Sequence, residues 1–200
     1  MVRLLRGPRR RRPRTQGARS NDKKPLRRRD EPDDHAIGRS RGGLTTKTHA
    51  LVDGRGLPLV LAVTPGQAND SPALPRMLAE LRVPRPGPGR PRTTPEALRA
   101  DKAYSARAHR AHLRDRGITA VIPEPSDQIR HRRNKGSRGG RPVDFDTDDY
   151  KNRNVVERAF NHIKNWRGLA TRYDKHALVY RGGVVLAAIV LWLNDLGDAP

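Results

Sequence analysis

Residues 45–64 read TTKTHALVDGRGLPLVLAVT, two β-prone runs on either side of the turn Asp53-Gly54-Arg55-Gly56. Val, Leu and Thr favour strands in this setting, and a short Gly-rich turn between two such runs is typical of a β-hairpin. We therefore predict an antiparallel hairpin, and the rest of the chain can be interpreted outward from it.

Downstream of the hairpin, helical and β-prone segments alternate. The patterns predict a helix over residues 71–81 capped by Asp70 or Ser71, a strand over 98–101, a helix over 105–116 and a strand over 118–122. Residues 82–95 hold five prolines and two glycines and are predicted to be a loop, and a final helix is predicted over 179–194. This order indicates an α/β domain with a mixed sheet.

A further helix is predicted over residues 147–165, TDDYKNRNVVERAFNHIKN. On a helical wheel, one face is apolar; its members are Val155, Val156, Ala159, Phe160, Ile163 and Trp166. Beside that face, Tyr150, Arg153, Glu157 and Lys164 fall within about 60° of arc. An acid between two bases suits a carboxylate that binds a divalent metal next to phosphates, but an ordinary solvated face with an i,i+4 ion pair fits the same pattern.

The composition points to an anionic partner. The 200 residues carry 42 Lys+Arg against 21 Asp+Glu, a net charge of +21, with 34% hydrophobic and 4% aromatic residues. A charge of this size favours nucleic acid over an anionic membrane surface. The absence of cysteine excludes disulfides and thiolate zinc sites and fits a reducing cytoplasm.

The sequence does not predict a membrane partner. The longest apolar run covers residues 184–193 and is half the roughly 20 residues that a spanning helix needs. The arginines near the N-terminus are not followed by the apolar stretch of a secretory signal. We therefore expect a soluble, cytoplasmic protein.

Residues 1–34 form an Arg-rich segment, with 13 Lys and Arg against 5 Asp and Glu. Few apolar residues and no periodicity predict disorder, because the segment cannot bury enough surface to offset its ordering entropy. Two interpretations stay open at this point: a basic arm that binds phosphates, or a stretch translated out of frame from GC-rich DNA.

The spacing of Tyr150, Arg153, Glu157 and Lys164 resembles the Tyr-Arg-Glu-Lys motif of DDE transposases of bacterial insertion sequences. Other parts of the chain resemble the same family; they are residues 38–47, 64–70, 100–104 and 166–175. The match covers residues 35–193, so residues 35–200 are interpreted as the C-terminal portion of a catalytic domain. The resemblance implies transposition by metal-dependent strand nicking and strand transfer.

The same resemblance implies a ribonuclease-H-like fold, a mixed sheet flanked by helices. Three acids would hold two Mg²⁺ or Mn²⁺ ions, and the family's positions map onto Asp101 as second metal ligand and Glu157 as third. Tyr150, Arg153 and Lys164 map onto DNA contacts. The implied partners are double-stranded DNA at the element ends and target, with a homodimer on paired ends by analogy.

One family feature has no counterpart in the sequence. The first aspartate should lie on an apolar first strand before the hairpin, and residues 1–34 show no such strand; Asp53, in its Gly-rich turn, is no substitute. We therefore expect an incomplete domain that lacks the first strand, from a truncated or frameshifted transposase, inactive alone. The rival interpretation is a non-catalytic basic DNA-binding protein or a transposase remnant. A zinc site at His109 and His112 is not expected, and both side chains are predicted to be solvated.

Overall fold

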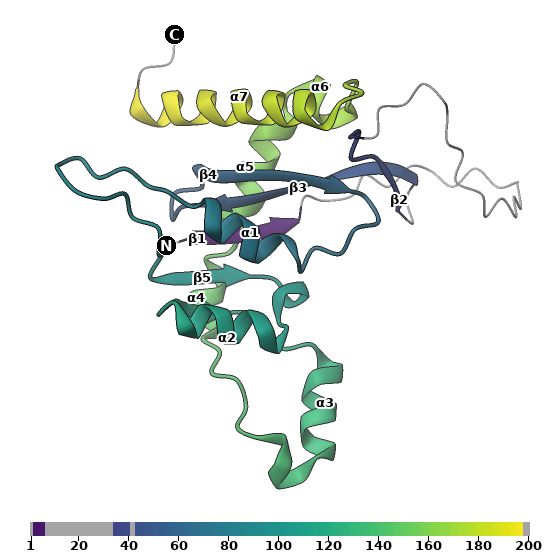
Figure 1. Cartoon of the computed structure of the whole chain (residues 1–200), viewed down its shortest axis with the longest axis vertical. Helices are drawn as coiled ribbons and strands as arrows, with labels where there is room; N and C mark the ends of the chain where they lie inside the picture. Colours follow the sequence, from purple (N-terminus) through teal and green to yellow (C-terminus); the bar gives the residue numbers. More distant parts are fainter. Residues whose placement is uncertain (1, 7–33, 41–42, 198–200) are drawn as a thin grey trace, which may run out of the picture.

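The computed structural model describes residues 2–6, 34–40 and 43–197. Its centre is a mixed sheet with the strand order β4-β3-β1-β5-β6 (Figure 1). The strands are β1 (Val2–Arg6), β3 (Gly43–Val52), β4 (Pro58–Pro65), β5 (Ala97–Ala100) and β6 (Thr119–Val121). A short strand, β2 (Gly38–Ser40), pairs only with the beginning of β3. The predicted mixed α/β architecture is confirmed.

Strand β1 corrects the expectation that the first strand is missing. Val2–Arg6 pairs antiparallel with β3, with Leu4 opposite Leu51, and parallel with β5, with Leu4 opposite Ala100. Predicted disorder is therefore wrong for these five residues, while residues 7–33 lie outside the described part. Backbone hydrogen bonds to β3 on one side and β5 on the other hold this strand. Because two of its five residues are arginines, the sequence pattern did not predict it.

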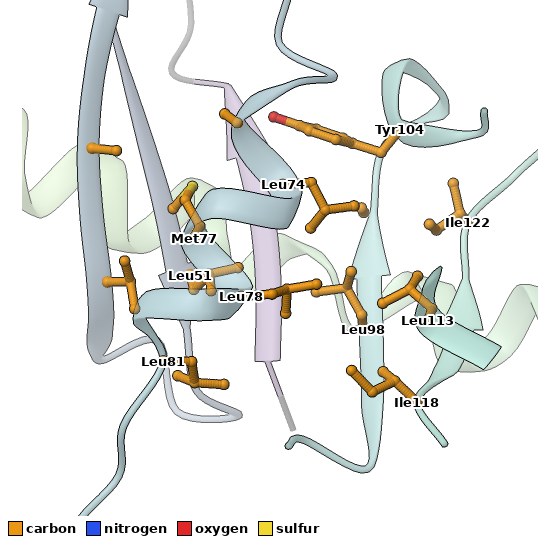
Figure 2. Close-up of a cluster of buried hydrophobic side chains, with 14 residues drawn as sticks. Leu51, Leu74, Met77, Leu78, Leu81, Leu98, Tyr104, Leu113, Ile118 and Ile122 are labelled. Carbon is orange, nitrogen blue, oxygen red and sulfur yellow. The ribbon is translucent and has the colours of Figure 1, made fainter. Parts of the chain in front are cut away.

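Two hydrophobic clusters cover the two faces of the sheet. On one face, α1 (Ala73–Glu80) and α2 (Arg107–Asp115) pack over side chains such as Leu51 and Leu98 (Figure 2). On the other, α5 (Asn154–Lys164) and α7 (Ala177–Leu196) pack over Ala50, Val52 and Leu61. The alternation of Ala50, Leu51 and Val52 between the clusters is the two-residue period expected of a strand buried on both faces.

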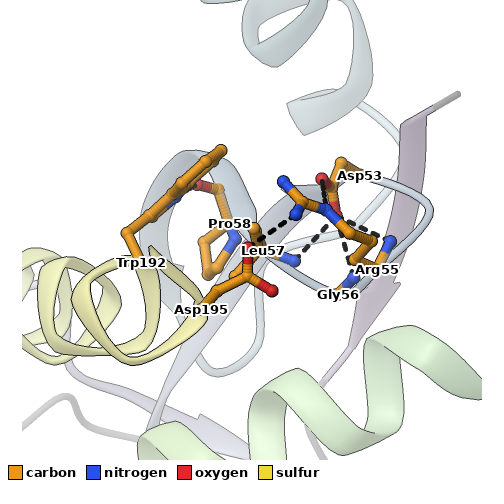
Figure 3. A network of polar contacts seen from close by, with 7 residues as sticks. All are labelled: Asp53, Arg55, Gly56, Leu57, Pro58, Trp192 and Asp195. Carbon is orange, nitrogen blue, oxygen red and sulfur yellow. Dashed lines mark hydrogen bonds and ion pairs between the residues drawn. The ribbon is translucent and has the colours of Figure 1, made fainter. Parts of the chain in front are cut away.

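The hairpin turn binds the C-terminal helix. Asp53 Oδ1 accepts hydrogen bonds from the backbone N–H groups of Arg55, Gly56 and Leu57 at 2.8–2.9 Å. Arg55 Nη1 lies 2.6 Å from Asp195 Oδ2, and Trp192 Nε1 donates to the Pro58 carbonyl at 2.9 Å (Figure 3). Asp53 therefore stabilises the turn, as its Gly-rich setting indicates, and Arg55 connects the turn to α7.

Helix α7 begins two residues earlier and ends two residues later than predicted. Among the described residues it is the one helix that has the length and apolar composition to cross a membrane, a test that core helices of soluble proteins also pass. Tyr180, Val184 and Ala188 are buried in the second cluster, whereas Leu186 is 63% exposed. The helix thus packs on the sheet by one side only.

Two further predictions are corrected near α1. Asp70 does not cap the helix, whose N-cap is Pro72; its carboxylate instead pairs with Lys47 Nζ at 2.8 Å. His109 on α2 is buried, not solvated, and its Nε2 lies 2.6 Å from Ser71 Oγ. The contact joins α2 to the segment before α1.

Burial, with a smaller contribution from His112, lowers the pKa of His109 below its usual value. Since the unfolded chain then takes up a proton at a higher pH than the folded chain, stability is full above about pH 6.5 and falls as the pH decreases below it. We expect a lower Tm on the acid side of that value, and a smaller pH dependence of Tm in His109→Gln. An unchanged pH dependence in the variant would contradict this role of His109.

Candidate active site

Asp101 lies at the carboxyl edge of the sheet. It follows β5 directly in an extended conformation, and its Oδ1 accepts a hydrogen bond from Ala103 N at 2.8 Å, which caps the short 3₁₀ helix η1 (Lys102–Tyr104). Because side chains alternate along a strand, Asp101 shares the face of Arg99 rather than that of Ala100. That face is the one covered by α5.

Arg99 fixes the helix that brings the next residues to this edge. The side chain is 7% exposed, and its Nε donates to Asp149 Oδ1 at 3.0 Å and to the Asp149 carbonyl at 3.2 Å, while Nη2 contacts the same carboxylate oxygen. Asp149 belongs to α4 (Thr147–Lys151). A buried guanidinium is thereby paired, and α4 is held against the end of β5.

The helix predicted over residues 147–165 is divided in two. Asn152 N bonds to Asp149 O at 3.2 Å and Arg153 N to Tyr150 O at 2.9 Å, so the chain tightens into i→i+3 bonds between α4 and α5. The anchored Asp149 lies at the start of this tight segment. The apolar face of α5 is buried as predicted, but Trp166 lies beyond the helix and is half exposed.

Tyr150, Arg153 and Glu157 form one contact group across the break. Arg153 Nη2 donates to Glu157 Oε1 at 2.9 Å, and its guanidinium carbon lies 5.4 Å from the centre of the Tyr150 ring. Phe145 packs edge-on against the same ring at 5.1 Å. The phenol is therefore held between an aromatic ring and a cation that is itself paired with an acid.

The electrostatics of Tyr150 connect this group with Asp101. Burial raises the pKa of the Tyr150 phenol, the charge of Arg153 lowers it, and the negative charges of Asp101 and Glu157 raise it further. Both carboxylates thus act on one phenol, although they are 56 residues apart in the sequence. Together with the Arg99–Asp149 contact, this puts four of the five predicted site residues on segments that adjoin the carboxyl end of β5.

Lys164 is the fifth and lies elsewhere. It is in the last turn of α5, two turns or about 10.5 Å along the axis from Glu157. Burial lowers the pKa of its ammonium group.

Comparison with known proteins identifies the family. The family model described as Transposase DDE domain matches residues 10–193. The chain belongs to this DDE transposase family. It is 34% identical over 151 residues to a protein of Brucella ovis named as a transposase for insertion sequence element IS6501, an alignment over 76% of this chain and all of the relative. It is 29% identical over 154 residues to the corresponding IS402 protein of Burkholderia cepacia, over 77% of this chain and 65% of the relative. No solved structure matches.

DDE transposases generally use divalent metal ions, and the residues of this transposase chain fit such ions only in part. In the part of the chain that the structure describes, no three acidic or histidine side chains gather as a metal site. Asp101 and Glu157 are the two acids that the family resemblance assigns to metal binding. Strand β1 supplies none, since Val2–Arg6 contains no acid.

The sheet register identifies the β1 position that neighbours Asp101. Leu4 lies opposite Ala100 in the parallel pair of β1 and β5, so the next position, Leu5, lies opposite Asp101. Positions in register on neighbouring strands share a face, and α5 contacts β1 as well as β3. The backbone register therefore makes Leu5 the β1 position next to Asp101 in the sheet.

Arg99 is the site residue that sequence analysis missed. Arg99 lies between Leu98 and Ala100 in a strand that was expected to be buried. A buried cation needs an acidic partner, and this requirement could have identified Arg99 from the sequence. Its partner could not be chosen among Asp144, Asp146, Asp148 and Asp149 from the sequence.

Proposed function

We propose that this chain is a transposase catalytic domain of the ribonuclease-H-like type, whose site for metal-dependent nicking and strand transfer is incomplete. The observation that supports it most is the Arg99–Asp149 ion pair, which holds α4, and with it Tyr150 and the adjoining Arg153–Glu157 pair, against the end of β5 that Asp101 follows. The sheet order, with β1 between antiparallel β3 and parallel β5, supports the fold assignment.

The residues at this edge divide into two roles. Asp101 and Glu157 are the proposed ligands for Mg²⁺ or Mn²⁺, which in a complete site would activate water or a 3′-hydroxyl and stabilise the departing oxygen. Arg153 is proposed to contact a DNA phosphate beside Glu157, with Tyr150 as a supporting hydroxyl. Lys164 is proposed to contact the DNA farther along α5. The reaction class is hydrolysis of a phosphodiester bond followed by attack of the freed 3′-hydroxyl on target DNA.

We expect the chain to leave supercoiled DNA bearing the element ends uncut in the presence of Mg²⁺ or Mn²⁺. Two carboxylates cannot hold two closely spaced divalent ions as three do, because one bridging ligand is missing. A gel assay of plasmid nicking measures this directly. Clean, end-specific nicking by the unaltered chain would contradict the proposal that its site is incomplete.

The proposed partner is double-stranded DNA, in the cytoplasm, with dimers on paired ends by family analogy. The alternative function is a non-catalytic DNA-binding protein or a transposase remnant, and the acid-free β1 strand together with the charge of +21 favours it. Both functions predict DNA binding that weakens steeply with salt. They differ in a chain to which a third carboxylate has been added. If the fold is catalytic, Glu157→Gln in that chain abolishes DNA cleavage and preserves DNA binding; if the protein only binds DNA, the substitution changes neither.

A further inference from the structure

The segment between β6 and α4 is a basic projection that the proposed catalytic residues do not use. We call residues 126–141 the basic arm; it contains α3 (Ser126–Asn134) and the 3₁₀ helix η2 (Gly136–Gly139). In Figure 1, α3 extends beyond α2, away from the sheet. The arm holds six Lys or Arg residues and one acid, Asp127.

The arm has a defined shape although no residue of α3 is buried. Its one apolar residue, Ile129, is only partly buried, so contacts other than core packing must hold the helix. Arg132 pairs with Glu124 at its base, and Gln128 Nε2 donates to Ser105 Oγ at 3.0 Å. At its tip, a Cβ on Gly139 would lie 2.2 Å from the Arg132 carbonyl oxygen, so only glycine permits the close return of the chain.

Both ends of the arm adjoin the candidate active site. Strand β6 runs parallel to β5, so its carboxyl end, from which the arm departs, lies at the same edge as Asp101. The arm returns to α4, which carries Tyr150. Its contact through Ser105 is four residues from Asp101. DNA lying along the arm would therefore reach the residues proposed to act on it.

The charges on the arm are turned outward. Arg130, Arg133 and Arg138 are exposed, and no ion pair to another described residue involves them. The nine residues of α3 span about 13.5 Å, which is close to four phosphate-to-phosphate steps of about 3.4 Å along one DNA strand. The arm contains no Phe, Tyr or Trp on which unpaired bases could stack, which favours a duplex over a single strand.

We infer that the basic arm binds the phosphate backbone of duplex DNA next to the site of cleavage, through Arg130, Arg133 and Arg138. This inference rests on the proposed function, since it names the surface by which the transposase domain holds its substrate. It assigns DNA affinity to one protrusion and not to the charge of the whole molecule.

The test compares two sets of three exposed arginines in the full chain. Arg130, Arg133 and Arg138 are changed together to Glu, and in a second variant to Gln. The control changes Arg82, Arg85 and Arg90 to Glu; these lie in the loop before β5, at the opposite edge of the sheet. The control matches the first variant in charge, and the Gln variant removes contacts without adding repulsion.

Fluorescence anisotropy with a short mixed-sequence duplex, over a series of KCl concentrations, gives the affinity and its salt slope. We expect both arm variants to lose about tenfold or more in affinity, and the Gln variant to lose about 2.7 from the slope of log K against log salt, roughly 0.9 for each phosphate contact. The control should keep most of its affinity and its slope.

Equal losses in the arm Glu variant and the control, or a Gln variant that binds like the unaltered chain, would overturn the assignment. Losses seen with a single strand but not with the duplex would overturn the choice of partner. If the unaltered chain binds no DNA, the proposed function fails as well. If the unaltered chain binds DNA and both arm variants bind it equally well, only this inference is refuted.

Discussion

Asp149→Ala is expected to destabilise the fold by about 3–5 kcal/mol, the range for removing one partner of a buried ion pair. The substitution leaves the Arg99 guanidinium, 7% exposed, without its carboxylate. Arg99 Nη1 already lacks a hydrogen-bond partner among the described residues, so no second acceptor there is ready to compensate. Loss of the anchor also frees α4 and, with it, the position of Tyr150. Chemical denaturation of the unaltered and variant chains measures the difference in free energy of unfolding.

The neighbouring acid provides a matched control. Asp148 is on the same helix, carries the same charge and pairs with Lys151, but its side chain is 88% exposed. Asp148→Ala should cost about 0.5 kcal/mol or less, as is usual for exposed pairs. The double variant Arg99→Met with Asp149→Leu should recover much of the loss, because it removes both buried charges. Equal destabilisation by Asp148→Ala and Asp149→Ala would show that α4 is not held by this ion pair.

The parts of the fold with a strong sequence pattern were predictable. The hairpin and the later helices and strands lie within a few residues of their predicted positions, because their apolar residues face a core and are spaced accordingly. Strand β1 and α3 were not. The first is held by backbone pairing on both sides, and the second has no buried face, so neither leaves a hydrophobic period in the sequence.

The candidate site was predictable only as a set of residues. The motif spacing named Tyr150, Arg153, Glu157 and Lys164, and the resemblance of residues 100–104 to the family named Asp101. The geometry around them depends on tertiary contacts. The break between α4 and α5 accompanies the Arg99–Asp149 contact, and no local pattern places a break at that point of a good helical sequence. His109 illustrates the same limit: its burial follows from its contact with Ser71, 38 residues away.

Leu5→Asp is expected to create a divalent-metal site where the described residues supply only two of the proposed carboxylate ligands. Position 5 follows the Leu4–Ala100 pair in the backbone register and is therefore next to Asp101, and three carboxylates at one edge require a cation to remain ionised together. Without metal, the variant should be less stable than the unaltered chain. At a free metal concentration about 100 times Kd, binding should add about 2.7 kcal/mol of stability. Leu5→Asn is the control, and adding Glu157→Gln to Leu5→Asp should remove most of the gain.

The most direct test of the proposed site is a titration of the Leu5→Asp chain with Mn²⁺, followed by paramagnetic broadening of its backbone amide signals. The account predicts that Asp101 and Glu157 broaden first, at concentrations that leave the Leu5→Asn chain unaffected. Broadening that begins at the acids around Asp146, or that is the same in both variants, would contradict the claim that β1, β5 and α5 meet at a transposase active site.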